Sequence, residues 1–314
     1  MKIPSPVYVA GHKGLIGSAF LRRLRRESSV DVLTADHSEL ELTDASAVRE
    51  FFERHRPQTV ILAAGRVGGI IANRDSPADF ITDNLSIQLN VLRSAHRVGV
   101  QKLILLGSSC MYPRECPQPM HEGQLLTGHP EPTSLPYAIA KLGGVYMCMA
   151  YNQQFGGRRF IPVIPNNAYG PNDNFDPDTS HVLSALIRKF FDAKMRGDKV
   201  VSLWGTGSPR REFIHVDDIA DACLFLLEND DPDLEVPVNI GSGKDISISE
   251  LAQLIAEIVE YEGRVEWDDS KPDGAPRKLL DSSRIKSLGW NPAVPFREGV
   301  RSTYEWFRNN SHQE

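Results

Sequence analysis

The stretch that decides the fold of this chain is Val7-Tyr8-Val9-Ala10-Gly11-His12-Lys13-Gly14-Leu15-Ile16-Gly17. Four apolar residues of strand type run into three glycines spaced three apart, and apolar residues then recur at helical spacing through Leu15–Arg26. In this setting Gly11 allows a tight turn, Gly14 the close approach of a pyrophosphate, and Gly17 the close packing of helix on strand. Free N–H groups at the start of the helix attract phosphate. The stretch predicts a dinucleotide-binding unit, in preference to a glycine-rich turn without a ligand.

Strand-like and helix-like stretches then alternate over the first half of the chain. The strands are apolar along their whole length, which is typical of a parallel sheet covered on both faces. We expect an α/β fold: a Rossmann-like, doubly wound parallel sheet with a smaller C-terminal α/β substrate-binding domain. Further strands are expected at Val30–Thr34, Thr59–Ala63, Lys102–Gly107 and Arg159–Pro165, and helices at Ala45–Arg56 (capped by Asp44), Ala78–Val98 and Tyr137–Phe155.

From Tyr169 onward the pattern is looser and begins with a polar loop, Pro171–Ser180. No repeat or long linker separates two halves, so we expect the domain boundary to be crossed more than once. Residues 1–168 with 212–240 are expected to form the dinucleotide-binding domain, and residues 169–211 with 241–314 the substrate domain. Helices are expected at His181–Arg196, Asp217–Glu228, Ser247–Val259 (with a capping box, Ser247 to Glu250) and Phe296–Asn309, and strands at Ser202–Trp204 and Val238–Ile240.

Composition and charge exclude several classes of protein. The chain is 41% hydrophobic with a formal net charge of −6, which gives no electrostatic basis for nucleic-acid or membrane binding. Its apolar runs have the length of strands and are too short to span a bilayer, and the first strand begins too soon for a signal peptide. Cys110, Cys116, Cys148 and Cys223 form neither a CxxC pair nor a disulfide framework, and no metal site is expected. A cytoplasmic protein is expected.

The residues after the second strand bear on the kind of dinucleotide. An acidic residue there binds the ribose 2′-hydroxyl of NAD, whereas basic residues hold the 2′-phosphate of NADP. This chain has Asp36 and His37 at that point, and Lys13 in the glycine turn. Lys13 and His37 favour NADP(H) and Asp36 favours NAD(H), so the residues leave both open.

A serine, a tyrosine and a lysine indicate hydride transfer. Ser108 follows the fourth strand, at the sheet edge where open α/β folds bind ligands. Tyr137 and Lys141 are four residues apart and share one face of a helix. A lysine ammonium beside a tyrosine favours the phenolate and lowers a pKa that is ordinarily near 10. These three residues, in this order after a glycine turn, predict polarisation of a carbonyl for reduction.

Cys110 and His181 are candidates for a second chemistry. Cys110 lies two residues after Ser108, and His181 begins a helical stretch. Taken singly, a cysteine is more often an inert buried side chain, and a histidine can simply cap a helix. Beside a polarised ketone, the pair suits proton removal and return at the adjoining carbons. The residues therefore suggest a sugar epimerase that is also a reductase.

Two polar loops suggest a nucleotide-linked substrate. The first, Trp204–Phe213, joins an aromatic face to Arg210 and Arg211, and guanidinium groups bind pyrophosphate through paired hydrogen bonds. The second, Lys271–Lys278, contains Asp273, which suits a base or a sugar hydroxyl. Exposed turns with solvated charges are the alternative interpretation of both loops.

Over nearly its whole length the sequence resembles the GDP-L-fucose synthases of the extended short-chain dehydrogenase/reductase family. The related sugar dehydratases have Thr-Asp-Glu where this chain has Ser108-Ser109-Cys110. One departure from the family is the lack of arginines in the glycine turn and after the second strand, where this chain has Lys13 and Asp36-His37. The most specific stretches are Gly11–Gly17, Val67–Ile70, Leu106–Tyr112, Glu131–Lys141, Pro165–His181, Trp204–Asp218 and Lys271–Asp281.

The resemblance implies a role for each candidate residue. Ser108, Tyr137 and Lys141 resemble the reductase triad, and Cys110 with His181 the epimerase acid–base pair. Substrate contacts are expected at Lys189, Trp204, Arg211 and Asp273. The expected cofactor is NADP(H), with NAD(H) as the alternative, and its binding set is Gly11, His12, Lys13, Gly14, Leu15, Ile16, Gly17, Asp36, His37, Gly107, Ser108, Tyr137, Lys141, Pro165, Asn166, Asn167, Ala168 and His181.

The implied reaction converts GDP-4-keto-6-deoxy-D-mannose to GDP-L-fucose by epimerisation at C3 and C5 and hydride transfer from NADPH to C4. One alternative is the same chemistry on another GDP-4-keto sugar, such as a GDP-L-colitose-type dideoxy sugar or a heptose. Another is a non-catalytic nucleotide-sensing protein of the same fold. The resemblance also implies a homodimer through helices Ala78–Val98 and Tyr137–Phe155, with Gly143 and Gly144 allowing close approach between subunits or packing on the sheet.

Overall fold

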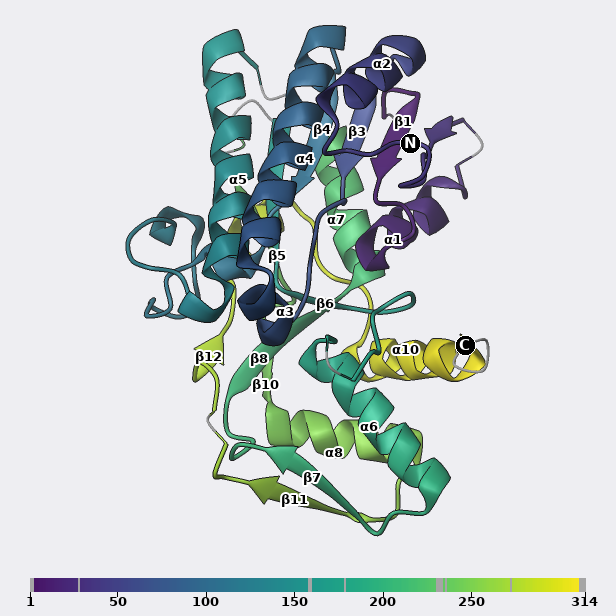
Figure 1. Ribbon diagram of the computed structural model, residues 1–314, viewed down its shortest axis with the longest axis vertical. Coiled ribbons are helices and arrows are strands. Elements are labelled where there is room, and N and C mark those ends of the chain that lie inside the picture. The colour runs from purple at the N-terminus through teal and green to yellow at the C-terminus, as the bar shows by residue number, and fades with distance from the viewer. Residues whose placement is uncertain are drawn as a thin grey trace.

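A computed structural model of the chain describes residues 3–27, 29–157, 160–177, 179–229, 234, 236–271 and 273–310. Its centre is a wholly parallel sheet with the strand order β2-β1-β3-β4-β5-β9 (Figure 1). The order reverses between β1 and β3, where doubly wound folds open a crevice at the carboxyl ends of their strands. The expected Rossmann-like fold is confirmed. The strands are β1 (Val7–Ala10), β2 (Val32–Leu33), β3 (Thr59–Leu62), β4 (Lys102–Leu106), β5 (Phe160–Pro165) and β9 (Val238–Ile240).

Helices cover both faces of this sheet. Val7 and Val9 of β1 enter one apolar layer, whereas Tyr8 and Ala10 enter the other, because successive side chains of a strand point to opposite faces. The first layer contains α1 (Leu15–Leu24) and α7 (Val216–Glu228), and the second contains α2 (Ala45–His55), α4 (Pro77–Val98) and α5 (Leu135–Phe155) (Figure 1).

A third apolar cluster forms the lower part of the molecule in Figure 1. There β8 (Arg210–His215) pairs with β6 (Asn167–Tyr169), β10 (Asp245–Ser247) and β12 (Arg277–Lys278). Since β6 follows β5 after one residue, this pairing joins the lower part to the carboxyl edge of the main sheet. The other elements here are α6 (Val182–Arg196), β7 (Val200–Trp204), α8 (Ile248–Val259), β11 (Arg264–Asp268) and α10 (Phe296–Asn310). The short helix α9 (Ser283–Ser287) instead packs on the main sheet, where Ile285 enters the first apolar layer.

Apolar spacing and capping residues in the sequence predicted most of the helices. The Asp44 side chain accepts hydrogen bonds from Ser46 N and Ala47 N, and Ser247 with Glu250 forms the predicted capping box. No sequence pattern indicated the short helix α3 (Ile70–Asp75), and β8 runs through the end of the expected loop Trp204–Phe213. Arg159, expected to begin β5, lies outside the described residues. No helix in the described ranges is long and apolar enough to cross a membrane.

Candidate active site

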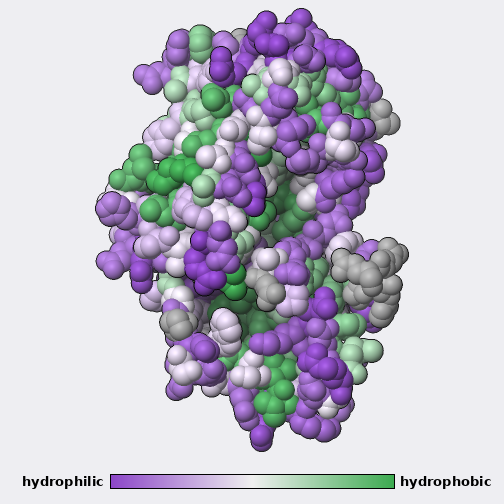
Figure 2. Space-filling view, in the orientation of Figure 1, coloured by the Kyte–Doolittle hydropathy of each residue, from purple (hydrophilic) through white to green (hydrophobic). Residues whose placement is uncertain are grey.

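A cavity of about 780 Å³ lies where β1 to β5 end, and Figure 2 shows the surface hollowed at mid-height of the molecule. The structure brings most of the predicted site residues together here. Of the predicted cofactor residues, only Lys141 is not part of its wall. The predicted residues in the wall are Gly11, His12, Lys13, Gly14, Leu15, Ile16, Gly17, Asp36, His37, Gly107, Ser108, Cys110, Tyr137, Pro165, Asn166, Asn167, Ala168 and His181.

The glycine turn has the geometry that a dinucleotide cradle needs. Gly11 has a φ of +80°, and a Cβ there would lie 2.7 Å from Ala64 N. A Cβ on Gly17 would lie 2.0 Å from the Gly11 carbonyl oxygen, so only glycine lets α1 pack this closely. Gly14 caps α1, and a Cβ there meets no atom nearer than 3.4 Å. The turn therefore presents the start of a ten-residue helix to the cavity.

At the end of β2, Lys13 and Asp36, which favour different cofactors, are paired with each other, whereas His37 Nε2 lies 2.8 Å from Glu41. Lys13 Nζ lies 2.7 Å from one oxygen of Asp36, and His12 Nε2 lies 3.1 Å from the other. The hydrogen bond from Lys13 lowers the pKa of Asp36, so the carboxylate is ionised at neutral pH. This end of the cavity therefore carries an ion pair beside an imidazole, not a lone carboxylate.

Ser108, Tyr137 and Lys141 form one connected group. The Tyr137 hydroxyl and the Ser108 side chain share a hydrogen bond, and Ser108 Oγ also accepts from Cys110 N at 3.2 Å. Lys141 is buried, donates to Leu106 O at 2.8 Å, and has its Nζ 5.8 Å from the centroid of the Tyr137 ring. Successive turns of α5 thus place the phenol in the cavity wall and the ammonium behind it.

Burial shifts the pKa values of both helical residues. Burial raises the pKa of Tyr137, and the hydrogen bond with Ser108 opposes this rise. The sequence analysis had expected Lys141 to lower this pKa. Burial lowers the pKa of Lys141 to about 8. Tyr137 is therefore protonated at neutral pH, the form in which it can donate a proton to a carbonyl oxygen that receives hydride.

Cys110 and His181 are open to the same cavity. Cys110 is half-buried and close enough to Tyr137 for a charge on its sulfur to raise the tyrosine pKa. His181 precedes α6 and is exposed, but its side chain makes no capping hydrogen bond. It lies near Asp173, whose pKa is raised by burial; hydrogen bonds from Ser184 and Asn174 and the nearby His181 offset part of this rise. The helix-cap interpretation of His181 is therefore not what the structure shows.

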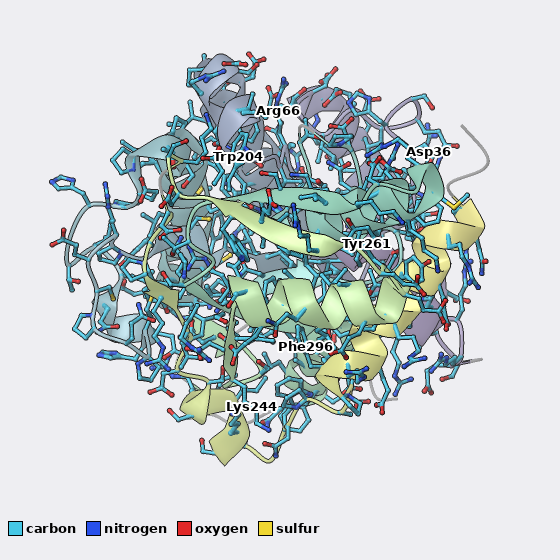
Figure 3. The ribbon with its side chains drawn as sticks, turned by 90° about the horizontal axis from the view of Figure 1, so that it is seen from below. Asp36, Arg66, Trp204, Lys244, Tyr261 and Phe296 are labelled. Carbon is cyan, nitrogen blue, oxygen red and sulfur yellow. The ribbon has the colours of Figure 1, made fainter. Side chains whose placement is uncertain are left out.

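The four predicted substrate contacts lie outside the wall of this cavity. Lys189 Nζ donates to the carbonyl of Ser202 on β7, and Trp204 at the end of that strand is 70% exposed. Asp273 accepts from Thr206 N at 3.0 Å and lies close enough to raise the pKa of Arg211, which burial lowers. Figure 3 shows Trp204 left of the middle of the molecule and Asp36 near its right side. The four residues thus gather around β7 and β8, away from the ion pair at the end of β2.

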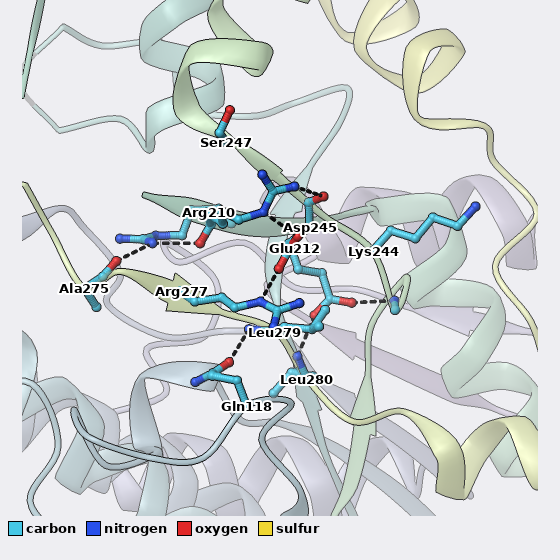
Figure 4. A network of polar contacts seen from close by, with 12 residues as sticks. Gln118, Arg210, Glu212, Lys244, Asp245, Ser247, Ala275, Arg277, Leu279 and Leu280 are labelled. Carbon is cyan, nitrogen blue, oxygen red and sulfur yellow. Dashed lines mark hydrogen bonds and ion pairs between the residues drawn. The ribbon is translucent and has the colours of Figure 1, made fainter. Parts of the chain in front are cut away.

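A buried carboxylate ties these strands to the cavity (Figure 4). Glu212 of β8 is fully buried and accepts from the side chain of Asn166, from Gly243 N at 2.6 Å and from Leu280 N at 2.8 Å. Asn167, also in the cavity wall, donates to the Glu212 carbonyl at 2.7 Å. Burial raises the pKa of Glu212 while these donors lower it. The network fixes the wall after β5 relative to β8.

The sequence assigned no site role to the part of the wall after β3, although Val67–Ile70 was among the stretches that carry the family resemblance. Ala63, Ala64, Gly65, Arg66, Val67, Gly68 and Asn73 line the cavity there. A Cβ on Gly65 would lie 2.7 Å from Asn84 Oδ1 and 3.5 Å from Lys141 Nζ, so glycine keeps this strand end close to the lysine. The glycines of this stretch were a signal that the sequence contained, although their function was not evident from it.

The parallel sheet and the glycine cradle define a dinucleotide-binding α/β protein, and the adjacent Ser, Tyr and Lys are typical of carbonyl reduction. The sequence profile of the NAD dependent epimerase/dehydratase family matches residues 7–241, and the chain belongs to this family.

Several proteins of known name are similar to the chain over nearly its whole length. The chain is 53% identical to GDP-L-fucose synthase 1 of Arabidopsis thaliana, over 97% of this chain and 93% of that protein. It is 48% identical to GDP-L-fucose synthase of Escherichia coli (strain K12), over 97% of both. Among solved structures, a GDP-mannoheptose C4 reductase from Campylobacter jejuni with NADP bound superposes with a TM-score of 0.90 at 37% identity, covering 98% of this chain and 99% of that one.

Proposed function

We propose that the protein is an NADPH-dependent epimerase and reductase that converts GDP-4-keto-6-deoxy-D-mannose to GDP-L-fucose. The observation that carries the proposal is the meeting of Ser108, Cys110, Tyr137 and His181 in one cavity, beside a glycine cradle. The two similar GDP-L-fucose synthases support the choice of sugar.

In the proposed mechanism, the C4 ketone is held by the Tyr137 and Ser108 hydroxyls and acidifies the protons at C3 and C5. Cys110 and His181 exchange these protons, one removing a proton and the other returning one on the opposite ring face, so that each centre inverts through an enolate. Tyr137 then gives its proton to the C4 oxygen as the carbon is reduced. Lys141, close behind the ring, stabilises the resulting phenolate. Bound NADPH supplies the hydride.

NADP(H) is the proposed cofactor. The cradle fits its pyrophosphate, and the solved C. jejuni reductase was obtained with NADP. At the end of β2, Lys13 offers positive charge to a 2′-phosphate, and its ion pair partly neutralises Asp36. The assignment of Gly11–Gly17, Gly107 and Pro165–Ala168 to cofactor contacts rests on their position in the wall.

Substrate recognition is assigned to the lower part of the molecule. We propose that residues 1–168 with 212–240 bind the cofactor and that residues 169–211 with 241–314 bind the GDP-sugar. Trp204 offers an exposed ring for a base, and Arg211, held by Ala275 O at 2.6 Å, faces the Asp273 loop. Lys189 adds a cation beside β7.

A homodimer through α4 and α5 is also proposed. Exposed apolar side chains recur on the outer face of α5 at helical spacing, namely Leu135, Ile139 and Tyr146, and Leu89 is exposed on α4. Gly143 and Gly144 have a different use, since a Cβ on Gly144 would lie 2.1 Å from Gln88 Oε1, so they let α4 and α5 pack within one chain. A cytoplasmic location is proposed, in keeping with four free cysteines.

A panel of GDP-4-keto sugars tests the proposal. Purified enzyme with NADPH is offered the 6-deoxy-mannose, a 3,6-dideoxy and a heptose substrate, and product stereochemistry is determined by NMR. We expect the highest kcat/KM with GDP-4-keto-6-deoxy-D-mannose and GDP-L-fucose as product. A strong preference for the heptose would favour the alternative that the C. jejuni reductase suggests. No NADPH oxidation with any sugar would favour the nucleotide-sensing alternative.

A further inference from the structure

Asn73 of α3 is a buried side chain in the cavity wall to which the mechanism above gives no role. It is 3% exposed, and its amide nitrogen donates to the carbonyl oxygens of Gly68 and Gly69, both at 3.1 Å. These two bonds fix the orientation of the amide, because the flipped form would point an oxygen at two carbonyl oxygens. Asn73 Oδ1 therefore faces away from the Gly68–Gly69 backbone.

That oxygen is a buried hydrogen-bond acceptor without a donor. Among the described residues, six buried side-chain atoms have no hydrogen-bond partner, and Asn73 Oδ1 is the one that belongs to a residue of the cavity wall. Buried polar atoms are nearly always paired, and each exception calls for an explanation. A ligand in the cavity that brings a donor supplies one.

The neighbours of Asn73 place it at the chemical end of the cavity. A Cβ on Gly69 would lie 3.5 Å from Thr179 O, two residues before His181. A Cβ on Gly68 would lie 3.2 Å from the Phe80 ring, whose centroid is 6.3 Å from that of Tyr137 in an edge-on contact. The Asn73 amide is thus bonded to a backbone segment that approaches both the residues before His181 and the Phe80 ring that packs on Tyr137.

We propose that Asn73 Oδ1 accepts a hydrogen bond from a ring hydroxyl of the 4-keto sugar and so orients the ring toward His181 and Tyr137. The inference rests on the proposed function. A hydroxyl has the required donor, whereas the ketone and the phosphates of the substrate only accept. A substrate that lacks this hydroxyl leaves the Asn73 oxygen unpaired, so the contact also discriminates between sugars.

The test combines one enzyme variant with three substrates. Asn73→Leu keeps the approximate volume and removes the acceptor, together with the two bonds that the amide donates to Gly68 O and Gly69 O. Its kcat/KM is compared with that of the wild type for GDP-4-keto-6-deoxy-D-mannose and for the 2-deoxy and 3-deoxy analogues. We expect a loss of at least tenfold with the full substrate, since one buried hydrogen bond alone accounts for about tenfold. With one of the two analogues we expect a loss about tenfold smaller than with the full substrate, because the partner hydroxyl is already absent and only the bonds to Gly68 and Gly69 are lost. The Kd for NADPH should not change.

Gln88→Leu is the matched control. Gln88 is 2% exposed and also has an unpaired amide oxygen, but it does not line the cavity. Its replacement should alter kcat/KM by the same factor for all three substrates. An equal loss for all three with Asn73→Leu, or a weaker NADPH affinity, would overturn the assignment. Should Asn73→Leu not fold, Asn73→Ser is compared in the same way. A wild-type enzyme that reduces none of the sugars contradicts the proposed function itself.

Discussion

Replacing Lys141 with Met should destroy activity and leave the protein as stable as before or more stable. Burial lowers the pKa of this lysine from 10.5 to about 8, which shows that the fold disfavours its charge. At 1.36 kcal/mol per pKa unit, that penalty is about 3 kcal/mol at neutral pH. Removal of the lysine also takes a donor from the Leu106 carbonyl, which costs about 1–3 kcal/mol. The free energy of unfolding at pH 7 should therefore rise by about 0–2 kcal/mol.

The difference in stability between the wild type and the variant should depend on pH. Between pH 8 and 10.5 the lysine is neutral in the folded protein and still protonated in the unfolded one. The unfolded state then binds more protons, so rising pH stabilises the wild type across this window. The methionine side chain of the variant cannot titrate. From pH 7 to pH 10.5 the free energy of unfolding of the wild type should therefore rise by about 3 kcal/mol relative to that of the variant. The other titrating groups are the same in both proteins and cancel in the difference.

Urea unfolding of wild type and Lys141→Met at several pH values measures this difference. NADPH oxidation with the keto sugar, followed in parallel, should fall about 100-fold or more. Lys244→Met, at an exposed position, is the control and should show neither effect. A variant that is several kcal/mol less stable at pH 7, with a gap to the wild type that does not change with pH, would refute the idea of a costly buried charge kept for catalysis.

Three further predictions concern the cavity and the proposed interface. Tyr137→Phe should lower hydride transfer by about 10² to 10⁴, with an unchanged circular dichroism spectrum and with deuterium exchange at C3 and C5 partly retained; NADPH oxidation at the wild-type rate would contradict the role of its hydroxyl. Asp36→Asn should release Lys13 and raise the ratio of NADPH to NADH kcat/KM several-fold, so an unchanged ratio argues against a 2′-phosphate at this point. Ile139→Asp should give a monomer in light scattering, and a wild type that is itself monomeric at micromolar concentration removes the proposed dimer.

Much of the fold followed from local sequence signals. The strand before Gly11 and the spacing of Gly14 and Gly17 specify a strand–turn–helix unit without distant contacts. By contrast, β8 forms by pairing with β6, β10 and β12, which are distant in sequence. No local sequence pattern therefore predicts it. The two-residue strand β2 was predicted to be longer because its apolar neighbours have strand character.

The residues of the site likewise fall into those that the sequence predicts and those that only the structure reveals. Ser108, Tyr137 and the glycine turn stand out by spacing and context, and the structure gathers them in one cavity. Asn73 could not be found from the sequence, since its interest lies in an oxygen left without a donor by two backbone contacts of its own amide. The effect of Ser108 on the Tyr137 pKa likewise depends on side-chain positions that spacing does not give.

The central claim, that one cavity both epimerises and reduces, is tested most directly by product analysis of Cys110→Ser and His181→Asn in deuterated water. Serine keeps the size of cysteine but replaces its thiol with a hydroxyl, which is a far weaker acid. Proton transfer at carbon should then slow and reduction overtake it. Each variant should release a reduced sugar nucleotide that is unepimerised or half-epimerised, with deuterium missing at C3, C5 or both. Fully epimerised, doubly deuterated product from both variants at near wild-type rates would contradict the account.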